Sequence, residues 1–399
     1  MTPSRHLLEF FALKRATVGL LLLVVLMGLG ERLAERFLPI YLLALGGGPL
    51  VIGLFGALHN LLGAIYSYPG GYLSERFGIH KSLLIINLTA MLGYVLVIAI
   101  PRWEAVLIGA VFFLAWSALS LPASMGLIAQ VLPSTKRTMG VTMHSLVKRI
   151  PMALGPILGG LCIDQFGEVD GIRISFGLAL LLAGTGLYAQ QRLIPDDRPT
   201  AAPHPHHWST ILTLLTPNMR RLLVADILVR FCEHMPYAFV VIWCMKEIAT
   251  PVSAVEFGVL TSIEMATAVL IYLPVAWMAD RTSKKPFVVI TFLFFTAFPV
   301  LLLHADSFTM LVIAFIVRGL KEFGEPARKA LILDLAQPDR RAMAFGAYYL
   351  VRDLFVAAGA FIGALLWQIG PEVNLWSSAA FGLAGTIWFA LKGQDEPGR

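Results

Sequence analysis

Acidic and basic residues recur at helical spacing inside long apolar stretches of this 399-residue chain. Glu31, Arg32, Glu35 and Arg36 all lie within one such stretch. Residues four positions apart share a helix face, so the acids and the bases form adjacent stripes. Each such charge costs about 2.5–3.5 kcal/mol at the centre of a membrane helix. They are therefore expected to face protein or water, either as an internal ion-pair cluster that fixes packing or as a site that exchanges protons and binds ions.

The second half of the chain repeats this chemistry at nearly constant offsets. Glu233 follows Glu31 by 202 positions, and Glu264 follows His59 by 205. Titratable residues at equivalent depth in both halves favour a functional role over a purely structural one. A buried carboxyl group holds a proton more readily than an exposed one and can carry it. Glu31, Glu233 and Glu264 are therefore the leading candidates for proton coupling.

The stretch 308–334 is the most highly charged of the apolar segments, and Gly324 and Pro326 within it permit a kink. A span this polar is expected to line water or protein. Its basic residues, with those of other spans, predict an anionic or zwitterionic substrate. The candidate substrate-binding residues are Arg32, Lys148, Arg149, Arg318, Lys321 and Arg352. The candidate proton-coupling residues are Glu31, Glu233, Glu264, Glu322, Glu325 and His59.

The elements that position these residues are predicted from composition. The chain is 57% hydrophobic and 14% charged, which is typical of a membrane protein. A spanning helix needs about 20 apolar residues. The sequence predicts an all-α membrane protein with twelve transmembrane helices in two pseudo-symmetric six-helix bundles. The predicted spans are 17–44, 49–68, 82–101, 105–131, 138–163, 174–190, 219–245, 254–279, 286–304, 308–334, 341–368 and 373–392.

Charge in the loops predicts the orientation. If the N-terminus is cytoplasmic, the outer loops hold only Arg102, Arg173 and Lys246, and the other loop cations are inside. This asymmetry predicts a multi-pass inner-membrane protein with both termini in the cytoplasm. It also explains the basic pI without nucleic-acid binding. The expected domains are 1–190 and 219–399, joined by a cytoplasmic linker, 191–218. The three cysteines lack paired spacing, so we expect neither a disulfide framework nor a metal site.

A polar segment between the second and third spans, Pro69–Lys81, has a partner 205 positions later that begins at Pro274. It resembles the signature loop of the major facilitator superfamily, Gly-x-Leu-(acid)-Arg-x-Gly-(basic)-(basic), with Trp277 replacing the first glycine of the second copy. In that family the loop latches the two halves on the cytoplasmic side. The resemblance implies a cytoplasmic gate formed by Gly71, Glu75, Arg76, Gly78, Lys81, Asp280 and Arg281.

The resemblance also implies that spans 1, 4, 7 and 10 line a central cavity. Gly155-Pro156-Ile157-Leu158-Gly159-Gly160 resembles a motif of the fifth helix that is associated with antiporters of the family. In contrast, no arginine lies between Arg102 and Lys136, where many family exporters carry one associated with proton coupling.

The expected function is secondary active transport by alternating access, with proton-coupled efflux of a small charged solute or drug. The alternatives are proton-coupled import of an organic anion and a non-transporting receptor or assembly protein. We expect no enzymatic activity and no cofactor, and no nucleotide-binding loop is present. The expected partners are a small-molecule substrate, protons and the lipid bilayer, with the chain acting as a monomer.

Overall fold

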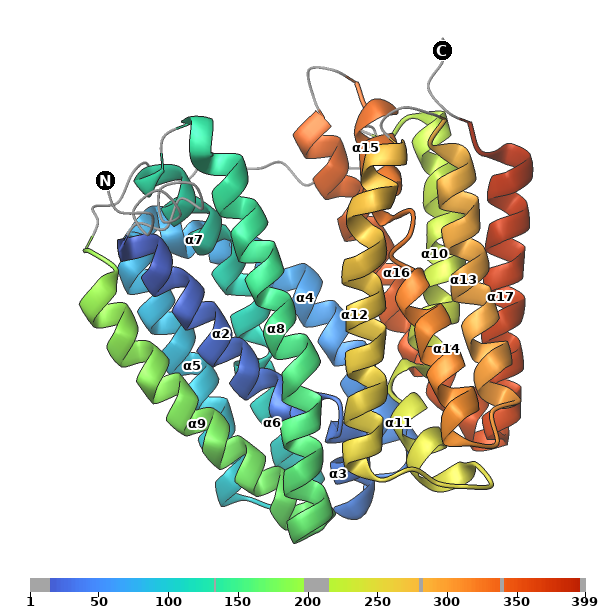
Figure 1. Ribbon diagram of the computed structural model, residues 1–399, viewed down its shortest axis with the longest axis horizontal. Coiled ribbons are helices and arrows are strands. Elements are labelled where there is room, and N and C mark those ends of the chain that lie inside the picture. The colour runs from blue at the N-terminus through green and yellow to red at the C-terminus, as the bar shows by residue number, and fades with distance from the viewer. Residues whose placement is uncertain (1–14, 133, 197–214, 280–282, 338–340, 395–399) are drawn as a thin grey trace. The chain divides into compact units, whose positions relative to one another are not determined.

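The computed structural model describes residues 15–132, 134–196, 215–279, 283–337 and 341–394 (Figure 1). Within these ranges the regular structure is entirely helical. The chain divides into two compact units: unit 1, residues 1–46 and 62–205, and unit 2, residues 47–61 and 206–399. The division near residue 205 falls in the expected linker, and the linker histidines His204, His206 and His207 lie outside the described residues.

Each predicted span corresponds to one helix or to an interrupted pair. Unit 1 holds α2 (Arg15–Glu35), α3 (Leu38–Ala44), α5 (Ile79–Ala99), α6 (Trp103–Phe113), α7 (Ala115–Val131), α8 (Ser134–Phe166) and α9 (Glu168–Leu193). Unit 2 holds α10 (Pro217–Tyr237), α11 (Val240–Ile242), the π-helix η2 (Trp243–Glu247), α12 (Ala254–Ala279), α13 (Lys285–Leu303), α14 (Phe308–Leu320), α15 (Glu325–Asp334), α16 (Arg341–Ile369) and α17 (Pro371–Lys392). The helix α4 (Pro49–Phe77) contributes residues 49–61 to unit 2 and the remainder to unit 1.

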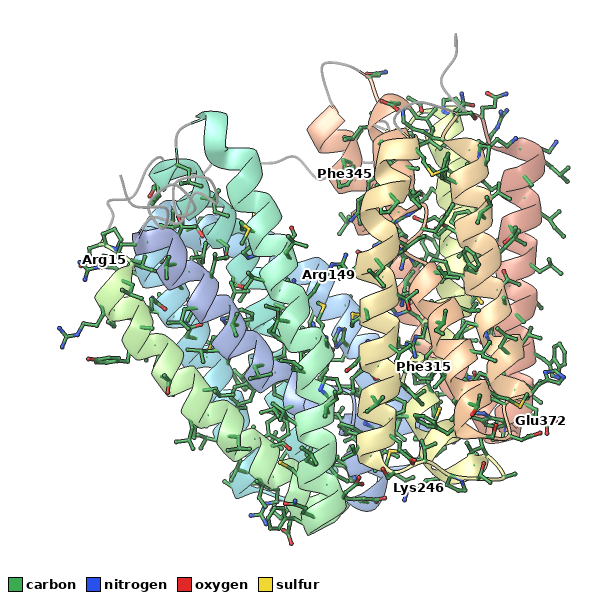
Figure 2. All side chains as sticks on the ribbon, in the orientation of Figure 1. Arg15, Arg149, Lys246, Phe315, Phe345 and Glu372 are labelled. Atoms are coloured by element: carbon green, nitrogen blue, oxygen red, sulfur yellow. The ribbon has the colours of Figure 1, made fainter. Side chains whose placement is uncertain are left out.

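The two units use the same helix pairs to bury their apolar surfaces. In unit 1, α2 packs on α8 and α9, while α5 packs on α6 and α9. In unit 2, α10 packs on α16 and α17, while α13 packs on α14 and α17. These are the same positions in the order of spans, and they confirm the predicted architecture of two pseudo-symmetric helical bundles. In Figure 2, Lys246 and Glu372 lie at one end of unit 2 and Phe345 lies toward the other, as alternating spans require.

Glycines set the closest of these packings. A Cβ atom added at Gly159 would lie 1.8 Å from the carbonyl oxygen of Leu33, so α8 and α2 meet backbone to backbone. A Cβ atom added at Gly363 would lie 2.2 Å from the carbonyl oxygen of Met235, so α16 and α10 meet in the same way. Small residues permit this close approach in membrane helices.

Eight described helical segments are long and apolar enough to cross a membrane, and the bent pair of α10 with α11 and η2 makes a ninth. The pair bends by 45°. Over the described residues, the predicted spans that do not qualify are the second, tenth and twelfth, and the second retains a shorter apolar helix, Pro49–Gly63. The tenth is broken into α14 and α15 by its charged centre, as the predicted kink at Gly324 and Pro326 implies.

Four predicted spans are interrupted: the first between α2 and α3, the fourth between α6 and α7, the seventh after α10, and the tenth between α14 and α15. These are the spans that the resemblance to the transporter family assigns to a cavity. Irregular backbone at membrane depth is tolerated where it is buried in protein or lines water. At the tenth-span interruption, the amide nitrogen of Gly324 donates to Thr291 Oγ1 on α13 at 2.5 Å.

The signature segment differs from the loop that the sequence predicts. The helix α4 continues to Phe77, nine residues beyond the expected end of the second span, and α5 begins at Ile79. A single residue, Gly78, makes the turn with φ of +82°, a conformation that L side chains rarely adopt. Within this extension, Arg76 Nη1 donates to Tyr72 Oη one turn earlier at 2.7 Å, a contact that favours the helix.

Candidate functional site

The first charged group surrounds Glu31 on α2. Its side chain is buried, and Ser117 on α7 donates its hydroxyl to the carboxylate, with oxygen separations of 2.6 and 2.8 Å. Arg32 Nη2 lies 3.7 Å from Glu31, while Arg32 Nη1 binds Glu35 directly. The buried acid thus has a neutral hydrogen-bond donor as its nearest partner.

A small cavity of about 10 Å³ adjoins this group. It is lined by Trp116, Ser117 and Ser120 on α7, by His144 and Lys148 on α8, and by two apolar side chains. That volume is enough for about one water molecule. The structure therefore brings Lys148 to the same place as Ser117, the donor to Glu31.

The second charged group surrounds Lys321, which follows α14. Lys321 Nζ donates to Glu233 on α10 at 2.9 Å and to Glu264 on α12 at 3.1 Å. Arg318 Nε lies 3.3 Å from the same Glu264 oxygen, and Arg230 donates to Glu233 at 2.6 Å. Acids and bases that the sequence assigns to separate roles therefore form one ion-paired cluster that joins three helices.

Aromatic rings enclose the cationic side of this second group. The Arg318 guanidinium stacks 4.8 Å from the centre of the Phe298 ring and lies 5.5 Å from the ring centres of Tyr237 and Phe315. Such contacts stabilise a desolvated cation. A cavity of about 10 Å³ lies beside Arg318, Lys321 and Glu233.

The interruption of the tenth span suits the charges at its ends. Lys321 caps the C-terminus of α14, where the helix dipole is negative, and Glu325 begins α15, where the dipole is positive. Had the helix continued, neither charge would have gained this interaction. The break thus places oppositely charged side chains on two helix ends inside unit 2.

Arg328 on α15 is a central residue that the site prediction missed. It is 1% exposed, donates to Asp226 on α10 and makes a bidentate contact with Glu325, in which Nη2 lies 2.8 Å from both carboxylate oxygens. Tyr348 on α16 donates to Asp226 at 3.0 Å. Charge inside the predicted spans was the available signal for Asp226 and Arg328, whereas nothing in the sequence singles out Tyr348 or Ser117.

The remaining predicted site residues lie apart from these contacts or at their edges. Arg352 on α16 pairs with its neighbour Asp353, stacks 4.1 Å from the Tyr349 ring centre, and places its Nη1 3.8 Å from Asp226 at the edge of the Arg328 contacts. Arg149 lies on α8 (Figure 2), and Glu322 lies in the turn between α14 and α15. His59 on α4 meets Phe55 edge to face, with ring centres 6.5 Å apart.

The residues of the predicted gate are described only in part. Arg76 packs on Tyr72 of its own helix, and Lys81 is exposed in the first turn of α5. Gly71 and Glu75 fall within α4, and Gly78 makes the turn. Asp280 and Arg281 lie outside the described residues. The gate remains a prediction.

A buried hydrogen-bond network of amide side chains lies next to the Glu31 group. Asn87 on α5 donates to Gln190 on α9 at 2.7 Å, and Trp116 Nε1 donates to Asn87 at 2.6 Å. Gln190 donates in turn to the backbone carbonyl of His80 at 2.9 Å. Asn87 and Gln190 therefore fix the position of Trp116, the residue before Ser117. They lie on α5 and α9, the third and sixth spans, whose apolar sequences predict a purely structural role.

We expect Asn87→Ala to lower the free energy of unfolding by about 1–3 kcal/mol, because it removes the partner of two buried polar atoms, Gln190 Oε1 and Trp116 Nε1. Equilibrium unfolding in mixed micelles measures the change. Thr89→Ala on the same helix is the control, since Thr89 is half-buried and donates its hydroxyl to the carbonyl of Ile85 in its own helix. Equal stability of the two variants would contradict the prediction.

Comparison with known proteins now identifies the family. The family model of the Major Facilitator Superfamily matches residues 20–247 and 222–399, which together span nearly the whole chain. The chain belongs to the Major Facilitator Superfamily. It is a multi-pass membrane protein of a transporter family, as the signature segment implied.

Individual members of the superfamily are only distantly similar. An uncharacterized MFS-type transporter of Methanocaldococcus jannaschii is 22% identical over 353 residues, which cover 84% of each protein. The tetracenomycin C resistance and export protein of Streptomyces glaucescens is 28% identical over 132 residues, 32% of this chain and 24% of that protein.

Solved structures of superfamily transporters share the fold. A mutant of the nucleoside transporter NupG aligns with a TM-score of 0.77 at 15% identity, covering 95% of this chain and 100% of that one. The peptide transporter POT in complex with sulfate aligns with a TM-score of 0.76 at 14% identity, covering 95% and 93%. At these identities the similarity establishes the fold and not the substrate.

Proposed function

We propose that this superfamily member is a secondary active transporter that couples proton movement to the export of a small anionic or zwitterionic organic solute. The observation that carries the proposal is the pair of buried acid–base groups, around Glu31 in unit 1 and around Lys321 in unit 2. Each group lies on interrupted spans, where transporters build sites for ions and substrates. Charges buried at this depth mark ion and substrate pathways.

The basic residues support a charged substrate. Arg318 is 4% exposed and is held by rings and by Glu264, and Lys321 is shared between two carboxylates. An anionic group that enters this cluster can replace a carboxylate as the partner of either cation. A zwitterion can in addition offer its own cation to the carboxylate that is released.

Two observations support export. The helix α8 carries the Gly-Pro-x-x-Gly-Gly segment that resembles the antiporter motif, and its Gly159 lies against α2. The relative that matches a third of the chain is an export protein. The missing arginine in the fourth span favours the second candidate, proton-coupled import of an organic anion. Both directions are compatible with a cytoplasmic gate at Gly78 and with both termini in the cytoplasm.

The test is proton flux in proteoliposomes that contain the purified full-length protein and a pH-sensitive dye. The ligands are panels of organic anions, siderophore-like carboxylates and cationic drugs. We expect an organic anion or zwitterion to drive proton movement in the opposite direction, and we expect Glu31→Gln and Arg318→Ala each to abolish it. Arg102→Ala, at an exposed surface ion pair with Glu104, is the matched control and is expected to retain the flux.

Three outcomes would contradict the proposal. Solute transport without proton movement would indicate a uniporter or another coupling ion. Proton movement in the same direction as the solute would indicate the import alternative. Binding without transport of any ligand would favour a receptor or assembly protein.

A further inference from the structure

Glu31 and Glu233 occupy counterpart positions in the two halves, but their neighbours differ. The fourth and tenth spans are also related by a nearly constant offset: α6 and α14 begin at Trp103 and Phe308, and α7 and α15 end at Val131 and Asp334. At this offset, Ser117 in the first half is the sequence counterpart of Lys321 in the second. Ser117 donates to Glu31 on α2, and Lys321 donates to Glu233 on α10.

The second close cation of Glu233 also has no counterpart beside Glu31. Arg230, which donates to Glu233 at 2.6 Å, corresponds to Gly28 on α2. A Cβ atom added at Gly28 would lie 3.1 Å from the ring of Pro151, so α8 occupies the space that a side chain would need. Glu233 is therefore bound by two cations, and the closest partner of Glu31 is a neutral hydroxyl.

Other titratable groups lie near Glu31, on its own helix and on two others. Arg32 and Glu35 lie on α2, Lys148 lies on α8, and Tyr94 lies on α5. Arg32 is bound to Glu35 and lies 3.7 Å from Glu31, beyond hydrogen-bonding distance. His144 and Lys148 line the cavity that Ser117 also lines.

A hydroxyl and an ammonium respond differently when a bound carboxylate takes up a proton. A hydroxyl can donate to the carboxylate and can then accept from the carboxylic acid, so the contact survives in both states. An ammonium group has no acceptor atom. It loses its ion pair when the carboxylate that it binds takes up a proton. The cavity beside Ser117 has room for about one water molecule, which a proton needs to enter or leave.

We propose that the counterpart glutamates of the two halves, Glu31 and Glu233, have different roles in proton coupling. Glu31 takes up and releases the coupling proton, and Ser117 is the positioning residue that binds Glu31 in both protonation states. Glu233 stays ionised between Lys321 and Arg230 and serves as a fixed anion of unit 2. This division rests on the proposed proton-coupled function and narrows it to one carboxyl group.

Difference infrared spectroscopy of the full-length protein in lipid vesicles, between alkaline and acidic buffers, tests the division without a substrate. A protonated carboxyl group gives a C=O stretching band that a carboxylate lacks. We expect Glu31→Gln to remove the band that appears on acidification, and Glu233→Gln to leave it. Ser117→Thr is expected to preserve the band, because threonine keeps the hydroxyl.

Two substitutions of Ser117 separate positioning from simple packing. Ser117→Lys, which reproduces the neighbour of Glu233, is expected to abolish the Glu31 band. Ser117→Ala adds no bulk and covers the case in which the lysine variant does not fold. It is expected to move the band to higher frequency and to shift its titration midpoint, since the hydrogen bond is lost. An unchanged band in Ser117→Ala, or a band removed by Glu233→Gln and not by Glu31→Gln, would overturn the proposal.

The infrared measurement tests the role of Glu31, and the flux measurement tests the proposed transport function, so each can be refuted without the other. A Glu31 band without ligand-driven proton movement would refute the proposed transport coupling and leave Glu31 as a proton-binding site. Ligand-driven proton movement that persists while no Glu31 band is seen would support the transport function and overturn the role of Glu31.

Discussion

Replacement of Arg328 with methionine is expected to lower the free energy of unfolding by about 3–5 kcal/mol. The guanidinium is 1% exposed and binds carboxylates on α10 and α15, so its removal takes from Asp226 and Glu325 the closest cation that each of them has. Methionine retains much of the volume of the side chain, which limits the contribution of an empty cavity. Equilibrium unfolding in mixed micelles measures the loss.

The neighbouring lysine provides the matched control. Lys329 also contacts Glu325, at 3.4 Å, but its side chain is 46% exposed, and exposed ion pairs contribute about 0–1 kcal/mol. Lys329→Met is therefore expected to be nearly neutral. Adding Asp226→Asn and Glu325→Gln to Arg328→Met should recover most of the loss, because the buried charges are then removed together. Equal losses for Arg328→Met and Lys329→Met would show that the cluster does not stabilise unit 2.

Alanine at Gly159 or at Gly363 is expected to cost about 1–3 kcal/mol of stability, because each new methyl group would overlap a backbone carbonyl of the facing helix. The overlap can be relieved only if α8 moves away from α2, or α16 from α10. At Gly159 this movement also separates α8 from the helix that carries Glu31. We expect a lower melting temperature for both variants, measured by thermal unfolding in detergent.

The control for these variants is a helical glycine in open surroundings. A Cβ atom at Gly177 on α9 would have no atom within 4 Å, so Gly177→Ala should be neutral or slightly stabilising. Valine at Gly159 should be worse than alanine, since a branched side chain increases the overlap. A melting temperature for Gly159→Ala as high as that of Gly177→Ala would mean that the helices do not meet as closely as described.

The repeat explains why so much of the fold was accessible from the sequence. A duplicated pattern of apolar stretches fixes the number and order of the helices, and a charged centre with Gly324 and Pro326 predicted the break between α14 and α15. The end of α4 was misjudged because polar residues were interpreted as a loop. Polar residues such as Tyr72 and Arg76 are nevertheless compatible with a helix, and only Gly78 requires a turn.

The partners of the site residues were harder to predict from the sequence than the site residues themselves. Burial in an apolar stretch singled out Glu31 and Glu233, because a charge is expensive there whatever surrounds it. Their contacts join residues 86 and 88 positions apart, and they depend on how helices rotate against one another. Serine is common in membrane helices, so Ser117 carried no signal until its hydroxyl was seen against Glu31.

The turn between α8 and α9 keeps the ends of these two helices at a short, nearly constant distance inside unit 1. Gly167, with φ of +83°, is the only residue between Phe166 at the end of one helix and Glu168 at the start of the next. Consecutive Cα atoms are about 3.8 Å apart, so these two helix ends must travel together whatever else moves. Spectroscopic labels placed on either side of Gly167 would therefore keep a constant separation. Changes measured between labels elsewhere can be calibrated against that pair.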